Sequence, residues 1–451
     1  MRRRIVIALF VCLFGALAGM AWGEQRFPPP DFESGYKLPT TQAPAPRGLW
    51  LEYVDVVVLV ATLSLACYLV LKKRSRKGVL GLSIFSLLYF GFYREGCICA
   101  IGSVQNVALA LFDRGYALPM VAGTFFLVPL VGSLFAGRTF CSAVCPHGAI
   151  QDLVLLKPVK VPPWLEQSLG LLAYVYLGAA ALFAATGSAF IICRYDPIVP
   201  VFRLSGSFPM LLLGAGFLVI GMFVGRPYCR FLCPYGALLR LGAKVSKWRV
   251  TVTPDHCTQC RLCEYSCPYG ALQEPTAKPL DPRDRMADKR RFAWSLALVP
   301  VLLLSGGWLG SRLSVAASRI HPDVALAERL ATEKPTQPKV GSQVAEDLAL
   351  NWAQENPKDL LATAKSVRDR FRLGGWVCGA WIGLVVGAKL IGLSVRRGRT
   401  DYEPERGACL ACARCFEYCP NERVRLGIAP EGIGGTSSGL AEGVGAERGA
   451  H

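Results

Sequence analysis

Long apolar runs recur along the chain and are separated by polar or basic segments. A helix needs about 20 apolar residues to cross a bilayer, so these runs predict membrane-spanning helices. We predict seven spans, at residues 51–71, 79–93, 119–136, 169–192, 209–224, 292–310 and 375–393. The expected fold is therefore that of an α-helical polytopic membrane protein.

The N-terminal residues 1–23 open with three arginines and continue into an apolar stretch. This pattern is typical of a signal peptide or of an uncleaved N-terminal anchor. Residues 24–50 are polar and rich in proline, and we expect them to form an irregular extracytoplasmic tether. The tail, residues 427–451, is rich in glycine, serine and alanine and is predicted to be disordered.

Basic segments predict the orientation of the spans. Lysine and arginine crowd residues 72–77, directly after the first span, and residues 396–399, directly after the last. The positive-inside rule places such segments in the cytoplasm. An outside N-terminus followed by seven crossings leaves the C-terminus in the cytoplasm. We therefore expect a multi-pass protein of the bacterial inner (cytoplasmic) membrane.

The composition agrees with this interpretation. The chain has 451 residues, is 52% hydrophobic and carries a formal net charge of +18. The basic residues lie beside apolar spans rather than on a soluble patch, so nucleic-acid binding is not expected. No group of side chains has the pattern of acid–base or nucleophilic catalysis. An electron-transfer subunit is expected rather than a stand-alone enzyme.

Two cysteine runs with the same spacing are the strongest candidates for metal ligands in this sequence. Each has the spacing C-x2-C-x2-C-x3-C-P that is typical of bacterial ferredoxins, in which the fourth cysteine of each run ligates the cluster of the other run. The predicted ligands are Cys257, Cys260, Cys263 and Cys419 for cluster 1, and Cys409, Cys412, Cys415 and Cys267 for cluster 2. Zinc sites use four local ligands instead. Two [4Fe–4S] clusters are therefore expected on the cytoplasmic side.

The two runs are separated by two apolar spans and a polar segment. We therefore predict a small α+β ferredoxin-like domain that assembles from two distant halves on one side of the membrane. The predicted organisation is a membrane domain at residues 51–249, ferredoxin half 1 at 250–282, a span at 292–310, an extracytoplasmic helical segment at 311–374, a span at 375–394 and ferredoxin half 2 at 400–426.

A second cysteine motif occurs twice. The pattern G-R-x-[FY]-C-x3-C-P-x-G-A begins at Gly137 and again at Gly225, and each copy follows a predicted inward span. We interpret the copies as two hairpins related by a pseudo-two-fold axis along the membrane normal. Their cysteines are Cys141, Cys145, Cys229 and Cys233. These four thiols could hold a third [4Fe–4S] cluster, act as two redox dithiols, or serve only as packing residues.

Three further cysteines, Cys97, Cys99 and Cys193, are predicted to face outward. They are candidates for a further metal centre, a disulfide or free thiols. Asp196 and Arg194, next to the membrane edge, could contact a quinone head group, but we expect them to form salt bridges instead. His147 and His256 adjoin predicted ligands, where we expect polar support rather than ligation.

The paired motifs and the ferredoxin runs together resemble the NosR/NapH family of membrane iron–sulfur proteins, over about residues 50 to 425. The sequence departs from NosR in that no periplasmic flavin-binding domain is expected ahead of the spans. It departs also in having a membrane hairpin between the ferredoxin halves.

The resemblance implies that electrons pass between a quinone or quinol pool, or a cytoplasmic electron donor, and an extracytoplasmic redox partner such as a flavoprotein. An alternative implied function is a redox-sensing assembly or regulatory protein that supports maturation of a periplasmic metalloenzyme. Cluster potentials depend strongly on their surroundings, so the sequence does not predict the direction of electron flow.

Overall fold

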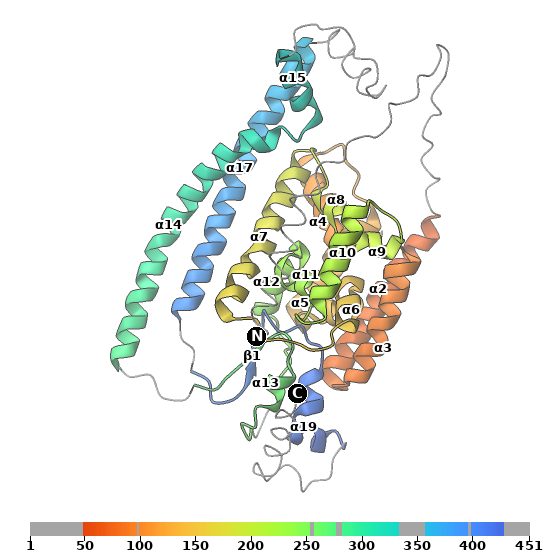
Figure 1. The fold of residues 1–451 in the computed structure, drawn as a ribbon, viewed down its shortest axis with the longest axis vertical. Helices are drawn as coiled ribbons and strands as arrows, with labels where there is room; N and C mark the ends of the chain where they lie inside the picture. The colour runs from red at the N-terminus through yellow and green to blue at the C-terminus, as the bar shows by residue number, and fades with distance from the viewer. Residues whose placement is uncertain are drawn as a thin grey trace.

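The computed structural model describes residues 48–96, 99–252, 257–276, 282–332, 357–395 and 398–427. This part of the chain is mostly helical (Figure 1). The predicted signal or anchor segment, most of the tether and nearly all of the tail lie outside the described residues, as do Cys97 and His256.

The first described helices form an antiparallel pair at the edge of the molecule (Figure 1). They comprise α2 (Leu49–Cys67) with its π-helical end η1 (Tyr68–Lys72), and α3 (Arg76–Ser86) with its π-helical end η2 (Leu87–Tyr93). Ser75 caps α3, because its hydroxyl accepts a hydrogen bond from the Gly78 amide at 3.2 Å. The turn between the helices contains Arg74 in the left-handed region, with φ +52°.

Two helical hairpins follow, and their order repeats. The first comprises α4 (Ala100–Phe112), α5 (Met120–Ala136), the π-helical turn η3 (Phe140–Val144) and α6 (Pro146–Leu153). The second comprises α7 (Pro163–Ala185), α8 (Ile191–Tyr195), α9 (Val199–Arg203), α10 (Phe208–Gly221), α11 (Pro227–Phe231) and α12 (Pro234–Lys244). In each hairpin a short helical turn leads into a helix that begins with the proline of a Cys-Pro pair.

A long hairpin then stands beside this bundle (Figure 1). It comprises α14 (Pro282–Ser318), α15 (Pro322–Thr332) and α17 (Pro357–Ser394). Glycines let α14 and α17 approach closely: a Cβ added at Gly306 or Gly310 would collide with backbone atoms of Gly379 or Gly375. Small residues at such crossings are the usual solution for helix packing in membranes.

A small module combines chain segments from both sides of the long hairpin. Its elements are α13 (Leu262–Ser266), β1 (Leu272–Gln273), β2 (Glu403–Pro404), α18 (Arg414–Tyr418) and α19 (Pro420–Arg425). The two strands pair antiparallel, with Leu272 opposite Pro404 and Gln273 opposite Glu403. Helix α13 also packs against α18.

Four helices in the described part of the chain are long and apolar enough to cross a bilayer: Trp50–Lys72, Pro163–Ala185, Met286–Ser318 and Pro357–Ser394. Three shorter apolar helices, Ala100–Phe112, Met120–Ala136 and Phe208–Gly221, accompany them within the described residues. The protein is thus a helical membrane protein, whereas the count of seven spans and their orientation stay predictions. Several helix limits differ from the predicted spans, most clearly for α17, which begins at Pro357 rather than at the expected Gly375.

Candidate metal centres

The first cysteine run and the last cysteine of the second run lie around one pocket. Gln259 and Arg261 have φ values of +51° and +63°, so the chain reverses direction between successive cysteines. These local turns bring the thiols to a common side. The pocket is lined by Cys257, Cys260, Cys263 and Cys419, together with Val252, Thr258, Arg261, Tyr402 and Asn421.

The second run has the same local geometry. Ala411 and Ala413, which correspond to Gln259 and Arg261 of the first run, have φ values of +53° and +62°. Burial raises the pKa of the Cys415 thiol well above its ordinary value, and four neighbouring thiolates raise it further. These neighbours are Cys409, Cys412, Cys267 and Cys263.

The pocket of the first run thus combines three of its thiols with Cys419 of the second run, whereas Cys415 of the second run lies near thiols of both runs. Thiols placed this close together repel one another when ionised, and a bound metal centre removes that penalty. No three His, Cys, Asp or Glu side chains of the described residues are placed to hold a single metal ion. A [4Fe–4S] cluster instead binds each of its four thiolates to a different iron. The assignment of individual ligands stays a prediction.

The paired motifs bring four more thiols together in the centre of the bundle. Cys141, Cys145, Cys229 and Cys233 are all buried and belong to one core. Cys145 interacts electrostatically with Cys229 and Cys141, and Cys233 with Cys229 and Cys145. This placement agrees with the prediction that the two hairpins come together.

Helix beginnings point polar groups at these sulfurs. Cys145 and Cys233 are the N-caps of α6 and α12, each followed by proline at the first helical position. The Gly236 amide donates to the Cys233 sulfur at 3.2 Å, and the Gln151 side-chain amide donates to the Cys229 sulfur at 3.2 Å. An anion on the sulfurs would be stabilised by these donors.

In each motif the second glycine, which follows the Cys-Pro pair, lies close to a backbone carbonyl oxygen. A Cβ added at Gly148 would collide with the Cys141 carbonyl oxygen, and one added at Gly236 would lie 3.1 Å from the Cys229 carbonyl oxygen. The arginines reach across the two copies. Arg226 of the second motif lies over Gly148 of the first, and Arg138 of the first lies over Gly236 of the second. Each motif thus supplies a cation to the other.

Two buried guanidinium groups make the four-cysteine site suitable for an anionic group. Arg138 is 2% exposed and Arg226 is 0% exposed, and the Nε of each has no hydrogen-bond partner among the described residues. Arg226 donates to the carbonyl oxygens of Cys141 and Ser142. Arg138 donates to the Gly407 carbonyl and makes no ion pair with a carboxylate within the described ranges. A buried cation needs a counter-charge, and a thiolate-bound cluster is anionic.

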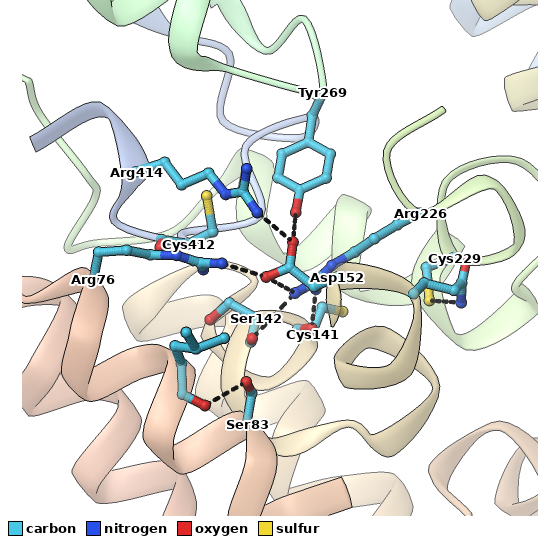
Figure 2. Close-up of polar contacts among 12 residues, drawn as sticks. Arg76, Ser83, Cys141, Ser142, Asp152, Arg226, Cys229, Tyr269, Cys412 and Arg414 are labelled. Atoms are coloured by element: carbon cyan, nitrogen blue, oxygen red, sulfur yellow. Dashed lines mark hydrogen bonds and ion pairs between the residues drawn. The ribbon is translucent and has the colours of Figure 1, made fainter. Parts of the chain in front are cut away.

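Asp152 on α6 links these motifs to the two-stranded module (Figure 2). Its carboxylate lies 2.7 Å from Arg76, 3.5 Å from Arg226 and 3.4 Å from Arg414. The Tyr269 hydroxyl donates to it at 2.9 Å. Burial alone would raise the pKa of Asp152, but the three arginines outweigh burial and hold it well below its ordinary value. The carboxylate is therefore ionised at neutral pH.

The Asp152 network contacts every cysteine group described above except the pocket of the first run. Arg76 donates to the Cys412 carbonyl oxygen at 3.2 Å, and Tyr269 lies two residues after Cys267. The sequence did not predict this network. A weak signal was present in Asp152 itself, an acid that follows the first paired motif, but its partners come from four distant segments.

His147 and Asp196 form a second buried polar pair. The His147 Nε2 lies 3.1 Å from the Asp196 carboxylate. Tyr228 donates to the same carboxylate at 3.4 Å, and its ring stacks on that of His147. The structure therefore places Asp196 in a buried hydrogen-bonded pair with His147, and a contact of Asp196 with a quinone head group stays a prediction. A polar supporting role for His147 beside Cys145 also stays a prediction.

Two of the three cysteines that are predicted to face outward lie near each other. Cys99 and Cys193 are free thiols that interact electrostatically, and Asp196 influences both. The Gln105 side chain accepts hydrogen bonds from the backbone amides of Ile192 and Cys193, and so ties α8 to α4. A metal centre at this place stays a prediction.

Comparison with known proteins supports the iron–sulfur interpretation. A family described as "4Fe-4S binding domain" matches residues 118–164, 207–252 and 263–287, and a second of the same description matches residues 250–273. These segments contain both paired motifs and the first ferredoxin run. The chain is thus a membrane protein with 4Fe–4S binding domains, and its cofactors are [4Fe–4S] clusters.

The chain is also similar to several individual proteins. The chain is 27% identical to Protein NirI of Paracoccus denitrificans over 239 residues, which are 48% of this chain and 35% of that protein. It is 27% identical to Regulatory protein NosR of Pseudomonas aeruginosa over 257 residues, 49% of this chain and 35% of that protein. It is 26% identical to Putative electron transport protein YccM of Escherichia coli over 181 residues, 36% of this chain and 50% of that protein.

These similarities support the resemblance to the NosR/NapH-type family of membrane ferredoxin-like proteins. The chain spans about a third of the length of NirI and NosR and half that of YccM. No solved structure matches it.

Proposed function

We propose that this protein conducts electrons within the membrane through three [4Fe–4S] clusters. In this proposal the electrons pass between a quinol pool or a cytoplasmic donor and an extracytoplasmic redox partner. Two clusters belong to a cytoplasmic ferredoxin-like module that combines residues 250–282 with 400–426. The third belongs to the four cysteines of the paired motifs.

The observation that carries the proposal is the polar connection between the second ferredoxin run and the paired motifs. The Arg76 and Arg226 side chains both pair with Asp152, and they also contact backbone carbonyls of Cys412 and Cys141. A fixed spacing between cofactors is what an electron-transfer chain requires. A set of isolated structural cysteines would not need buried cations between them.

Iron and acid-labile sulfide per chain, together with EPR spectra of the reduced protein, test the number of clusters. Cys229→Ala is expected to lose about four irons per chain relative to the native protein. The matched control is Cys378→Ala, because Cys378 is a half-buried free thiol on α17, far in sequence from the motifs. Unchanged iron in Cys229→Ala would leave redox dithiols as the role of the paired motifs.

A second candidate function is supported by the name of one relative, Regulatory protein NosR. In that case the clusters would sense redox state and support maturation of a metalloenzyme. Reduction of the clusters by a quinol separates the two functions. Reduction within the turnover time supports conduction, whereas slow reduction combined with a partner that lacks its metal supports maturation.

A further inference from the structure

A pocket that no cysteine lines lies between the first turns of α2 and the end of η2. Its volume is roughly 370 Å³, within the range of sites that hold small ligands. It is lined by Leu51, Val54, Asp55, Tyr89, Tyr93 and Arg94. A carboxylate, a guanidinium group and two phenol groups thus converge at one end of α2, a helix that is mostly apolar.

The charged pair in this pocket is buried. Asp55 is 2% exposed and Arg94 is 8% exposed, and their side chains lie 2.6 Å apart. The Tyr89 hydroxyl donates to the Asp55 carboxylate at 2.9 Å. Ionisable residues within membrane helices are costly and usually mark functional sites.

One donor of this cluster has no acceptor. The Nε of Arg94 is buried and makes no hydrogen bond within the described part of the chain. A buried N–H without a partner costs about 1–3 kcal/mol, and a ligand oxygen that accepts from it would remove that cost. The pocket therefore offers a ready donor to a ligand that carries an oxygen acceptor.

The surroundings of the pocket are apolar and face outward. Tyr93 is 62% exposed, and Leu88 and Val57 are also exposed along the same pair of helices. A ligand with a polar ring and a long apolar tail could place its ring in the pocket and its tail along this surface. The net charge of the Asp55–Arg94 pair is zero, which disfavours a free anion or a phosphate group.

We propose that this pocket binds the head group of a quinone or quinol. The planar ring would pack against Tyr89 or Tyr93, one ring oxygen would accept from Arg94, and an opposite hydroxyl would donate to Asp55. This inference rests on the proposed electron-transfer function and assigns the place where its membrane-soluble substrate binds.

Ring contacts connect the pocket with the four-cysteine site. The Tyr89 and Phe90 centroids are 5.1 Å apart, and those of Phe90 and Phe125 are 5.7 Å apart. The next residue, Phe126, lies 6.1 Å from Tyr235, whose ring lies 6.0 Å from that of Phe140. Phe140 directly precedes Cys141. A bound quinol would thus be packed against the core that contains the paired motifs.

The test uses the full-length protein in lipid nanodiscs and a photoreactive azido-ubiquinone as probe. Labelling is expected to map, by mass spectrometry, to residues 51–55 or 89–94, and to be displaced by unlabelled short-chain ubiquinone or menaquinone. Tyr89→Phe removes the hydroxyl that positions the Asp55 carboxylate for the ligand and is expected to weaken binding about tenfold. Tyr68→Phe is the matched control, because Tyr68 is exposed on η1, the continuation of α2, and does not line the pocket.

Labelling elsewhere, or equal binding by both variants, would overturn the site. Displacement by excess phosphatidylglycerol but not by quinones would also overturn it, in favour of a lipid head-group site. Cluster content and EPR spectra are recorded on the same samples. Clusters that are reduced by quinol while labelling falls elsewhere refute the pocket and leave the proposed function standing. Pocket labelling in a protein without clusters refutes the function and leaves the site.

Discussion

Replacing Asp152 by asparagine should destabilise the protein far more than the loss of an exposed ion pair would. The substitution keeps the shape of the side chain and removes its negative charge. Arg226 would then lose its only carboxylate contact among the described residues while remaining fully buried, and Arg76 would lose its 2.7 Å ion pair. The amide of the new asparagine would also direct donors at guanidinium donors.

The size of the effect follows from the burial of these partners. Removing one member of a buried ion pair costs about 3–5 kcal/mol, because the other charge stays buried without compensation. Arg414 is a quarter exposed and regains water, so its lost contact adds little. The expected loss in free energy of unfolding is therefore about 3–5 kcal/mol.

The assay is unfolding of the purified protein by SDS titration in detergent, followed by circular dichroism. Glu328→Gln is the control, because Glu328 pairs with Arg319 and Arg368 at 3.1 Å but is 36% exposed. Such an exposed pair contributes less than about 1 kcal/mol. A loss for Asp152→Asn no larger than that of the control would refute the reasoning.

The same carboxylate predicts a pH dependence. The pKa of Asp152 is lowered in the folded protein, so its stabilising contribution is present above the unfolded value of about 3.9 and is lost as the pH falls through the lower folded value. The difference in unfolding free energy between native protein and Asp152→Asn should therefore be constant from about pH 5 to pH 8. A difference that declines on going from about pH 8 to pH 6 would contradict this assignment.

Other substitutions test the remaining sites. Gly148→Ala should cost about 1–3 kcal/mol of stability, because the added methyl collides with the Cys141 carbonyl, whereas Gly81→Ala, where nothing lies within 4 Å, should be neutral or stabilising in the same SDS titration. Cys267→Ala should lose about four irons and one EPR signal while the first run keeps its cluster, and a variant that keeps all its iron would contradict ligation across the runs. Arg138→Gln should lower the midpoint potential of the cluster at the paired motifs in a redox titration monitored by EPR, because it removes a buried positive charge, and Arg138→Lys should restore it; equal potentials in all three proteins would show that this charge does not act on the cluster.

Local spacing predicted much of the site. The turns at Gln259 and Ala411 depend on residues within each run, so the curled shape of both runs could be read from the cysteine pattern. The paired motifs were recognised as a repeat for the same reason. Their glycines and arginines, however, act across the two copies, which only the folded structure shows.

Hydropathy identified the apolar part of each helix rather than the whole helix. Helix α14 begins at Pro282 and continues through the basic residues 283–291, and α17 begins at Pro357 in a polar stretch. Polar helical turns outside a bilayer carry no hydropathy signal, so these limits could not be predicted. The Asp152 network was missed because its partners are distant along the chain, Arg76 by 76 residues and Arg414 by 262, and local patterns contain no information at such separations.

The pairing of β1 with β2 has a consequence for the order of biosynthesis. The second strand is translated only after α14 and α17. During synthesis the first cysteine run therefore exists without the second run until the long hairpin has been made and inserted. In the proposed ligand assignment neither ferredoxin-type cluster has a complete set of thiolates before that point. Iron delivery would then succeed only on chains whose hairpin has been integrated in the correct direction, so that metallation itself acts as a checkpoint on membrane insertion.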